Sequence, residues 1–202
     1  LVGLILGAGW SNQEATAATY LCMAIAAVYI GAMNSAAAIV RERVIFDRER
    51  MFRLSIWAYL LSKTTVLAGV AAGQMVLLLV AQSYFMHLPV GVGNHILLAL
   101  ALTFAAITAT GLGLAISAFA RSTYVAVLLV PVLIIPQIVF TEVVLKGGID
   151  KKVPAMVENF PITKGGFEAL QMVGNDGRWD AFAGSVLAML ALLSGFLLVA
   201  AL

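Results

Sequence analysis

Charged residues are scarce in this chain, and their scarcity excludes an ordinary soluble domain. Only 11% of the 202 residues are Asp, Glu, Lys or Arg, whereas 62% are hydrophobic and the mean hydropathy is +1.03. A typical globular domain is roughly 45–50% apolar. The apolar residues form continuous blocks of about 20 residues, the length that crosses a bilayer as an α-helix. The blocks lack the alternation of transmembrane β-strands, so the sequence predicts an all-α polytopic membrane protein.

Several chemical signatures are also missing. The single cysteine, Cys22, lies in an apolar block and cannot form an intrachain disulfide. His87 and His95 are accompanied by no cluster of cysteines or carboxylates, so we expect no metal site. No G-x-x-x-x-G-K-[ST] loop is present to bind nucleotide phosphates, and we expect neither a catalytic residue nor a cofactor in this segment. Few ionisable residues lie at membrane depth, which argues against an ion-coupled transporter.

The apolar blocks predict five full membrane spans and one partial span. Leu1–Trp10 is too short to cross and is interpreted as the outer half of a first helix. The full spans are expected at Ala18–Val40, Thr64–Met86, His95–Phe119, Thr123–Val144 and Asp180–Leu202. Between them lie a charged segment, Arg41–Lys63, and a polar loop, Leu145–Trp179. Because the chain opens and closes inside apolar blocks, we expect it to be part of a longer protein.

The charged segment assigns an orientation to these spans. Arg41–Lys63 carries six basic and three acidic residues, a cluster that cannot lie in hydrocarbon. Cytoplasmic loops carry an excess of Lys and Arg, so we expect this segment and Arg121 on the cytoplasmic side and Leu145–Trp179 on the external side. The membrane is expected to be the cell (plasma) membrane. Residues 42–51 can form an amphipathic helix with Ile45 on its apolar side. A solvated loop anchored to lipid headgroups is the alternative.

The order of residue types in the charged segment forms a recognisable pattern. Its members are Glu42, Arg43, Phe46, Arg48, Glu49, Arg50, Tyr59, Ser62 and Lys63. The pattern resembles the segment between the second and third membrane helices of ABCG-like exporters, which are ABC transporters with the type-2 exporter fold. In that family the segment holds a coupling helix that docks on a nucleotide-binding domain. The resemblance implies this role for Glu42, Arg43, Phe46, Arg48, Glu49, Arg50 and Arg53.

A second motif lies in the long polar loop. Asn159–Leu170, NFPITKGGFEAL, is similar to the Phe-Glu-Ala-Leu signature of the same family. There the signature lies in an external loop whose short re-entrant helices cap the exit. The resemblance implies a cap that includes Pro161, Phe167 and Glu168. The Gly165-Gly166 pair replaces bulkier residues found in many relatives, so the sequence does not decide whether this stretch is helical.

The second and fifth predicted spans are candidates for a translocation path. Pro131 and Pro136 interrupt the fifth span, and proline frees a carbonyl and kinks a transmembrane helix; a static kink and a flexing helix both fit. By resemblance, these two helices line a cavity at a dimer interface. The candidate path residues are Ala27, Ile30, Asn34, Val130, Ile134 and Gln137. Buried Asn34 and Gln137 need polar partners, supplied by another helix or by substrate.

Small residues in the fourth span have a simpler interpretation. Gly111 and Gly113 are predicted to permit close packing of helices, because small side chains let helix backbones approach in membranes.

Together these observations favour the permease domain of an ATP-driven ABC exporter over residues 1–202. It would act as a dimer and move a lipidic or amphipathic substrate out of the cytoplasm or inner leaflet. The implied partners are a nucleotide-binding domain that carries ATP and Mg, fused as in bacterial relatives or separate, a second copy and membrane lipid, with no nucleic acid. The alternatives are a polysaccharide or drug permease with a separate ATPase chain, and a membrane scaffold that transports nothing.

Overall fold

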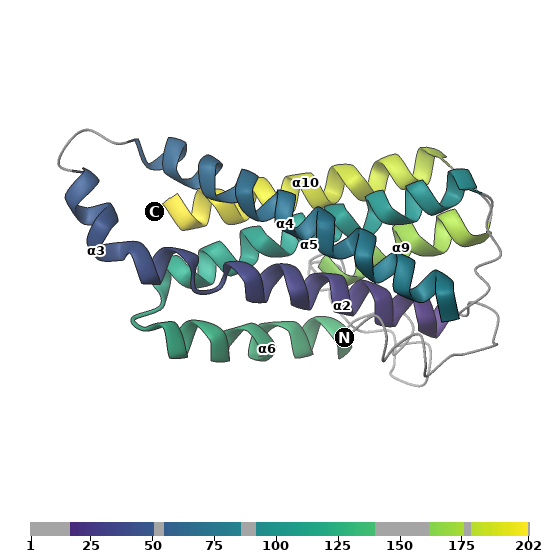
Figure 1. The fold of residues 1–202 in the computed structure, drawn as a ribbon, viewed down its shortest axis with the longest axis horizontal. Helices are drawn as coiled ribbons and strands as arrows, with labels where there is room; N and C mark the ends of the chain where they lie inside the picture. Colours follow the sequence, from purple (N-terminus) through teal and green to yellow (C-terminus); the bar gives the residue numbers. More distant parts are fainter. Residues whose placement is uncertain (1–16, 51–54, 86–91, 140–161, 176–178, 202) are drawn as a thin grey trace, which may run out of the picture.

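The computed structural model describes residues 17–50, 55–85, 92–139, 162–175 and 179–201. In chain order these form α2 (Ala17–Ser35), α3 (Ala38–Arg50), α4 (Ile56–Phe85), α5 (Val92–Phe119), α6 (Thr123–Val139), α9 (Ile162–Asn175) and α10 (Trp179–Ala201). Across these ranges the structure contains no β-strand. The helices run side by side as an elongated bundle (Figure 1). The predicted all-α fold is confirmed.

Four helices are long and apolar enough to cross a membrane, which confirms the polytopic architecture. They are Ala18–Arg43, Ile56–Phe85, Asn94–Phe119 and Phe182–Ala201, and Thr123–Pro136 is a shorter apolar helix. α6 continues through both Pro131 and Pro136 to Val139. The predicted partial span Leu1–Trp10 lies outside the described residues.

The start of α4 differs from the predicted boundary. The helix begins at Ile56, before the expected Thr64, because the Ser55 hydroxyl accepts a hydrogen bond from the Ala58 N–H at 3.2 Å and thereby caps the helix. Its 30 residues rise about 45 Å, more than the ~30 Å of hydrocarbon. Trp57 and Tyr84, 47% and 85% exposed, lie near its two ends, as aromatic residues do at membrane interfaces. α4 is therefore longer than a helix needs to cross the hydrocarbon, and a tilt or an extension beyond it accommodates the excess length.

The predicted polar loop contains a buried helix. In α9, Ile162, Phe167 and Leu170 are at most 2% exposed, and the helix packs against α2, α5, α6 and α10. The Gly165-Gly166 pair, for which the sequence did not decide between helix and loop, lies inside α9. A Cβ on Gly166 would lie 3.1 Å from the Ala105 Cβ, so glycine permits the close approach of α9 to α5.

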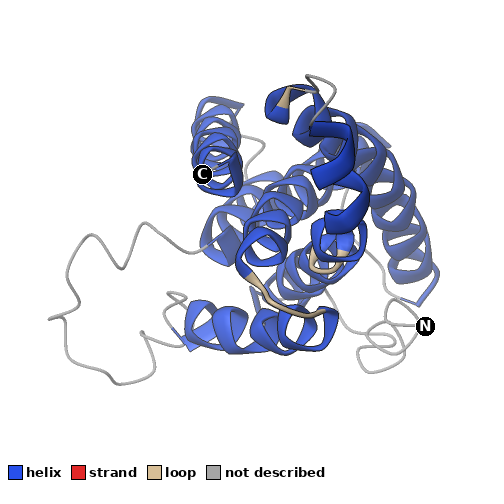
Figure 2. Ribbon diagram, turned by 90° about the vertical axis from the view of Figure 1, so that its left-hand side faces the viewer, coloured by secondary structure: helices blue, strands red, loops and turns tan. Residues whose placement is uncertain are grey.

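α5 is the central helix of the bundle. It contacts every other described helix. Figure 2 shows the bundle nearly end-on. From Ala105 to Ser117 all of its residues except Ile107 are buried, and most of them are Ala, Gly, Ser or Thr. Small residues of this kind let transmembrane helices pack closely.

Two glycines mark the closest approach of α2 to α5. A Cβ on Gly31 would lie 2.2 Å from the Ala106 carbonyl oxygen, and a Cβ on Gly113 would lie 2.1 Å from the Ser35 hydroxyl oxygen. On another face of α5, a Cβ on Gly111 would lie 2.7 Å from a methyl carbon of Leu193 in α10. The predicted packing role of Gly111 and Gly113 is confirmed.

We expect Gly113→Ala to destabilise the bundle by about 1–3 kcal/mol, the usual cost of overpacking a core. The physical reason is that Ala32 and Ser35 of α2 occupy the space that the new methyl group needs. Thermal unfolding of the purified protein in detergent measures the effect. Gly69→Ala is the matched control, because a Cβ there has no atom within 4 Å. Equal melting temperatures for the two variants would contradict the tight crossing.

Candidate functional site at the junction of α3 and α4

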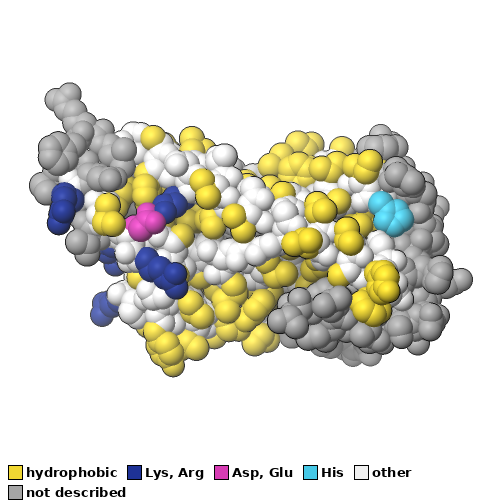
Figure 3. All heavy atoms as spheres, viewed as in Figure 1, with side chains coloured by type: hydrophobic (Ala, Val, Ile, Leu, Met, Phe, Trp, Pro, Cys, Tyr) yellow, Lys and Arg dark blue, Asp and Glu magenta, His cyan; other side chains and the backbone are white. Residues whose placement is uncertain are grey.

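Basic side chains gather at one end of the bundle. Figure 3 shows Lys and Arg at the left-hand end of this face, where Figure 1 places α3 and the start of α4. The described members are Arg41, Arg43 and Arg48 on α3, Lys63 on α4 and Arg121 in the α5–α6 turn. We call this the basic end. Two of its members, Arg43 and Arg48, are among the residues predicted to couple the membrane domain to an ATPase, and α3 contains four more of them.

A serine from α5 positions the start of α3. The α2 backbone leaves its helix at Ala36 and Ala37, and α3 follows at once. The Ser117 hydroxyl oxygen accepts hydrogen bonds from the Ile39 N–H and the Val40 N–H, both at 3.0 Å. The first N–H groups of a helix have no intrahelical partner, so Ser117 caps α3 from a neighbouring helix. The direction in which α3 leaves the bundle is therefore tied to α5.

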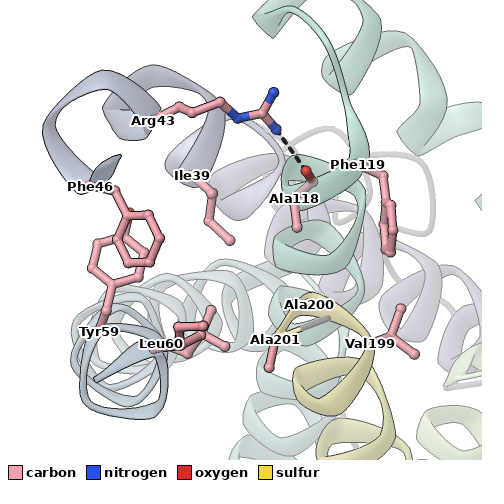
Figure 4. Close-up of a pocket in the computed structure, with 11 residues that line it drawn as sticks. Ile39, Arg43, Phe46, Tyr59, Leu60, Ala118, Phe119, Val199, Ala200 and Ala201 are labelled. Atoms are coloured by element: carbon pink, nitrogen blue, oxygen red, sulfur yellow. Dashed lines mark hydrogen bonds between the residues drawn. The ribbon is translucent and has the colours of Figure 1, made fainter. Parts of the chain in front are cut away.

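Arg43 forms a second link between α3 and α5. Its guanidinium donates a hydrogen bond of 2.7 Å to the Ala118 carbonyl oxygen (Figure 4). The last carbonyls of a helix lack intrahelical partners and carry partial negative charge. A cation at this position therefore both satisfies a backbone acceptor and stabilises the end of α5.

Glu42 and Phe46 hold α3 against α4. The Glu42 carboxylate forms an ion pair with Lys63 and accepts a hydrogen bond of 3.3 Å from the Tyr59 hydroxyl. The rings of Phe46 and Tyr59 lie 4.6 Å apart, centroid to centroid. Tyr59 and Lys63 are four residues apart on α4 and so share one helix face. These contacts exist because α4 begins early enough to place its first turns beside α3.

The opposite face of α3 is exposed. Arg41, Ile45 and Arg48 follow one another at intervals of four and three residues, which places them on one side of a helix. All three are exposed, and Ile45 retains 58% of its accessible surface. Two guanidinium groups flanking an aliphatic side chain can bind a partner surface that offers carboxylates around an apolar contact. We call this the outer face of α3.

The structure divides the predicted coupling residues into two groups. Glu42, Arg43 and Phe46 contact α4 and α5 of the same chain, whereas Arg48 lies on the outer face. Glu49 and Arg50 belong to α3, but their side chains lie outside the described residues, as does all of Arg53.

Sequence reasoning missed part of the outer face. The prediction placed Ile45 on an apolar side of the helix, and Arg41 was not among the coupling candidates. Both share a face with Arg48 in the structure. The available signal was the spacing of the three residues, four and three apart, which places them on one face of any α-helix that contains them.

The predicted path residues lie in different environments. Ala27 on α2 and Val130 and Ile134 on α6 are buried together in the core, at most 2% exposed, whereas Ile30 and Asn34 are half-buried. The Gln137 side chain lies outside the described residues. α2 and α6 are in contact, and these three side chains belong to one buried cluster.

Asn34 has the polar partner that its position requires. Its amide donates a hydrogen bond of 2.5 Å to the Gln74 side-chain oxygen of α4. The predicted interhelical hydrogen bond is therefore confirmed for Asn34. It joins α2 to α4 near the basic end.

The predicted cap residues lie at the other end of the bundle. Phe167 is 2% exposed and packs in the core, and Glu168 lies 3.9 Å from Lys164 one turn earlier on α9. Pro161 is outside the described residues. The structure thus places the motif on a buried helix at the end opposite α3 (Figure 1).

The family model described as ABC-2 type transporter matches residues 1–147 of the 202. The chain belongs to the ABC-2 type transporter family. The matched range contains α2 to α6 and the whole junction of α3 and α4, so the predicted ABC transporter membrane domain is confirmed. An ABC-2 membrane domain is the permease part of a transporter and is not itself catalytic. Among curated proteins no sequence matches this chain significantly.

The contact between Glu42 and Lys63 is expected to be energetically coupled. In a double-mutant cycle of Glu42→Gln and Lys63→Met, we expect an interaction free energy of about 0.5–3 kcal/mol, the range for residues in contact. Thermal unfolding in detergent supplies the four free energies. A cycle of Glu42→Gln with Arg121→Gln is the control, since Arg121 is exposed in the turn between α5 and α6 and forms no described contact with Glu42. Additivity in the first cycle would contradict the anchoring of α3 by α4.

Proposed function

We propose that this chain is the membrane domain of an ATP-driven exporter and that α3 receives force from a nucleotide-binding domain. The observation that supports this most is the outer face of Arg41, Ile45 and Arg48 on a helix anchored to α4 and α5. Positive charge favours the cytoplasmic side, where such a domain would lie. ABC-2 membrane domains typically pair with a nucleotide-binding ATPase, which would carry the ATP and Mg.

The contacts of α3 provide a route for the force. Displacement of α3 acts on α5 through Ser117 and Ala118, and on α4 through Tyr59 and Lys63. Because α5 contacts every other described helix, a shift at its end reaches the whole bundle. A packed interior transmits such shifts, since it has low compressibility.

A second copy of the chain would complete the path. The side of α6 away from the core is a row of exposed apolar residues, which are Tyr124, Val125, Leu128, Val132, Leu133 and Ile135. In the proposed dimer this row faces the other copy. Separation of α6 from α2 would then expose Ala27, Val130 and Ile134 to a central cavity. Because these side chains are apolar, the cargo would be lipidic or amphipathic, released outward past α9.

Reversing one charge on the outer face should uncouple transport from ATP hydrolysis. In full-length protein with its nucleotide-binding domain in lipid nanodiscs, we expect Arg48→Glu to reduce substrate-stimulated, vanadate-sensitive ATPase activity. Coupling free energies of 1–3 kcal/mol correspond to a reduction of about 5–150-fold. Basal hydrolysis and the melting temperature should change little, because Arg48 makes no described contact within the chain.

Arg121→Glu is the matched control, since it reverses an exposed arginine at the same end on a different turn. Stimulation that survives in Arg48→Glu, or falls equally in both variants, would overturn the docking role of α3. If the protein has no ATPase partner, the result supports the alternative of a membrane scaffold that transports nothing.

The proposed dimer predicts cross-linking through α6. In a Cys22→Ala background, which removes the chain's single cysteine, Leu128→Cys or Val132→Cys should form cross-linked dimers in membranes with a short thiol reagent. Leu77→Cys, on the exposed side of α4 and 71% accessible, should remain monomeric. Cross-linking confined to Leu77→Cys would place the interface on α4 and reject the proposed path.

A further inference from the structure

The basic end contains a cavity of about 410 Å³ between α3, α4, α5 and α10 (Figure 4). Its volume lies within the range of roughly 300–1,000 Å³ that is usual for small-molecule pockets. The wall is mostly apolar, formed by Ile39, Phe46, Leu60, Phe119, Val199 and the alanines at the end of α10. Neither the outer face of α3 nor the candidate path uses this space.

Arg43 is the one charged side chain among the described residues that line the cavity. It contributes a single described hydrogen bond, to the Ala118 carbonyl, whereas a guanidinium carries five N–H donors. The planar donor fork of arginine suits phosphate oxygens, which accept two parallel hydrogen bonds. The cavity therefore combines a phosphate-binding group with an apolar wall.

The position of the cavity favours a lipid as its occupant. Phe119 and Val199 are 65% and 42% exposed, so the apolar wall continues onto the lipid-facing surface of the bundle. Arg43 lies on α3, beyond the end of α2, at the level of the basic end. A phospholipid presents its phosphate and its acyl chains in this same order from the membrane surface inward.

The surrounding charges favour an anionic headgroup. Arg41 and Arg121 are exposed at the same end, and the Glu42 carboxylate is already neutralised by Lys63. Clusters of basic residues at the cytoplasmic side of membrane helices attract anionic lipids. A zwitterionic headgroup would instead bring a second cation next to these arginines.

We propose that the cavity binds one anionic phospholipid of the inner leaflet. Arg43 binds its phosphate, and an acyl chain lies along Ile39, Leu60 and Val199. The lipid fills the space between α3 and the end of α10 and holds α3 in its anchored position. The proposal shares with the proposed function only the cytoplasmic orientation of the basic end, and its test needs no ATPase.

Native mass spectrometry of the full-length protein tests the site. Detergent-solubilised protein is titrated with phosphatidylglycerol or with phosphatidylcholine of the same acyl chains. We expect one phosphatidylglycerol to be retained per chain under conditions that remove phosphatidylcholine. Arg43→Gln should weaken its retention by at least about tenfold, the effect of losing a hydrogen bond to a charged group. Arg121→Gln, an exposed arginine outside the cavity, should change it less than about twofold.

A second variant separates the site from the stability of α3. Ala200→Phe places a ring in the cavity and leaves the Arg43 side chain unchanged, and it should abolish retention while the melting temperature stays near that of the wild type. This variant decides the question if Arg43→Gln fails to fold.

Three results would overturn the proposal. Equal losses in Arg43→Gln and Arg121→Gln would show diffuse attraction to the basic end. Equal retention of the two lipids, or full retention in Ala200→Phe, would remove the cavity from the interaction. Binding of inorganic phosphate with no retained phosphatidylglycerol would identify a free anion as the ligand.

Discussion

The close packing of α2 against α5 is the constraint on which the rest of the bundle depends. Gly31 and Gly113 bring the two backbones within contact distance, and the Ser35 hydroxyl turns back to donate to the Gly31 carbonyl at 3.0 Å. Ser117 lies one turn beyond Gly113 on α5 and caps α3. One face of α5 thus sets both the helix crossing and the point where α3 begins.

Charge is used in two ways at the basic end. Glu42 pairs with Lys63 and Tyr59, and Arg43 donates one hydrogen bond to the Ala118 carbonyl at the end of α5, so both residues hold α3 in one position. Arg41 and Arg48 on the outer face are exposed and have no such contact among the described residues. Anchoring on one face and exposure on the other is what a force-receiving helix requires, because a loosely attached helix would move without displacing the bundle. The cavity beside Arg43 lies on the anchored side, where an occupant would act on the position of α3.

Sequence reasoning succeeded where composition alone decides the outcome. Apolar blocks of membrane-spanning length predicted α2, α4, α5 and α10, since hydrocarbon accepts only helices with satisfied backbones. It failed at boundaries set by local contacts. The cap at Ser55 extends α4 into the charged segment. In the polar loop the resemblance implied short re-entrant helices, and the structure describes α9 there, with Gly166 close to α5. Ile45, which was predicted to lie on an apolar side of the helix, is 58% exposed and shares a face of α3 with Arg41 and Arg48.

The sequence by itself determined the class of the molecule, its membrane spans and the gathering of basic residues between two of them. These follow from the cost of placing charge or an unpaired backbone in hydrocarbon, which depends only on residue type and order. The tertiary structure decided which charges are paired and which are exposed, where α3 begins and that a cavity forms beside Arg43. These depend on contacts between residues that are far apart in the chain, such as Ser117 with Ile39 and Glu42 with Lys63, which residue order alone does not specify.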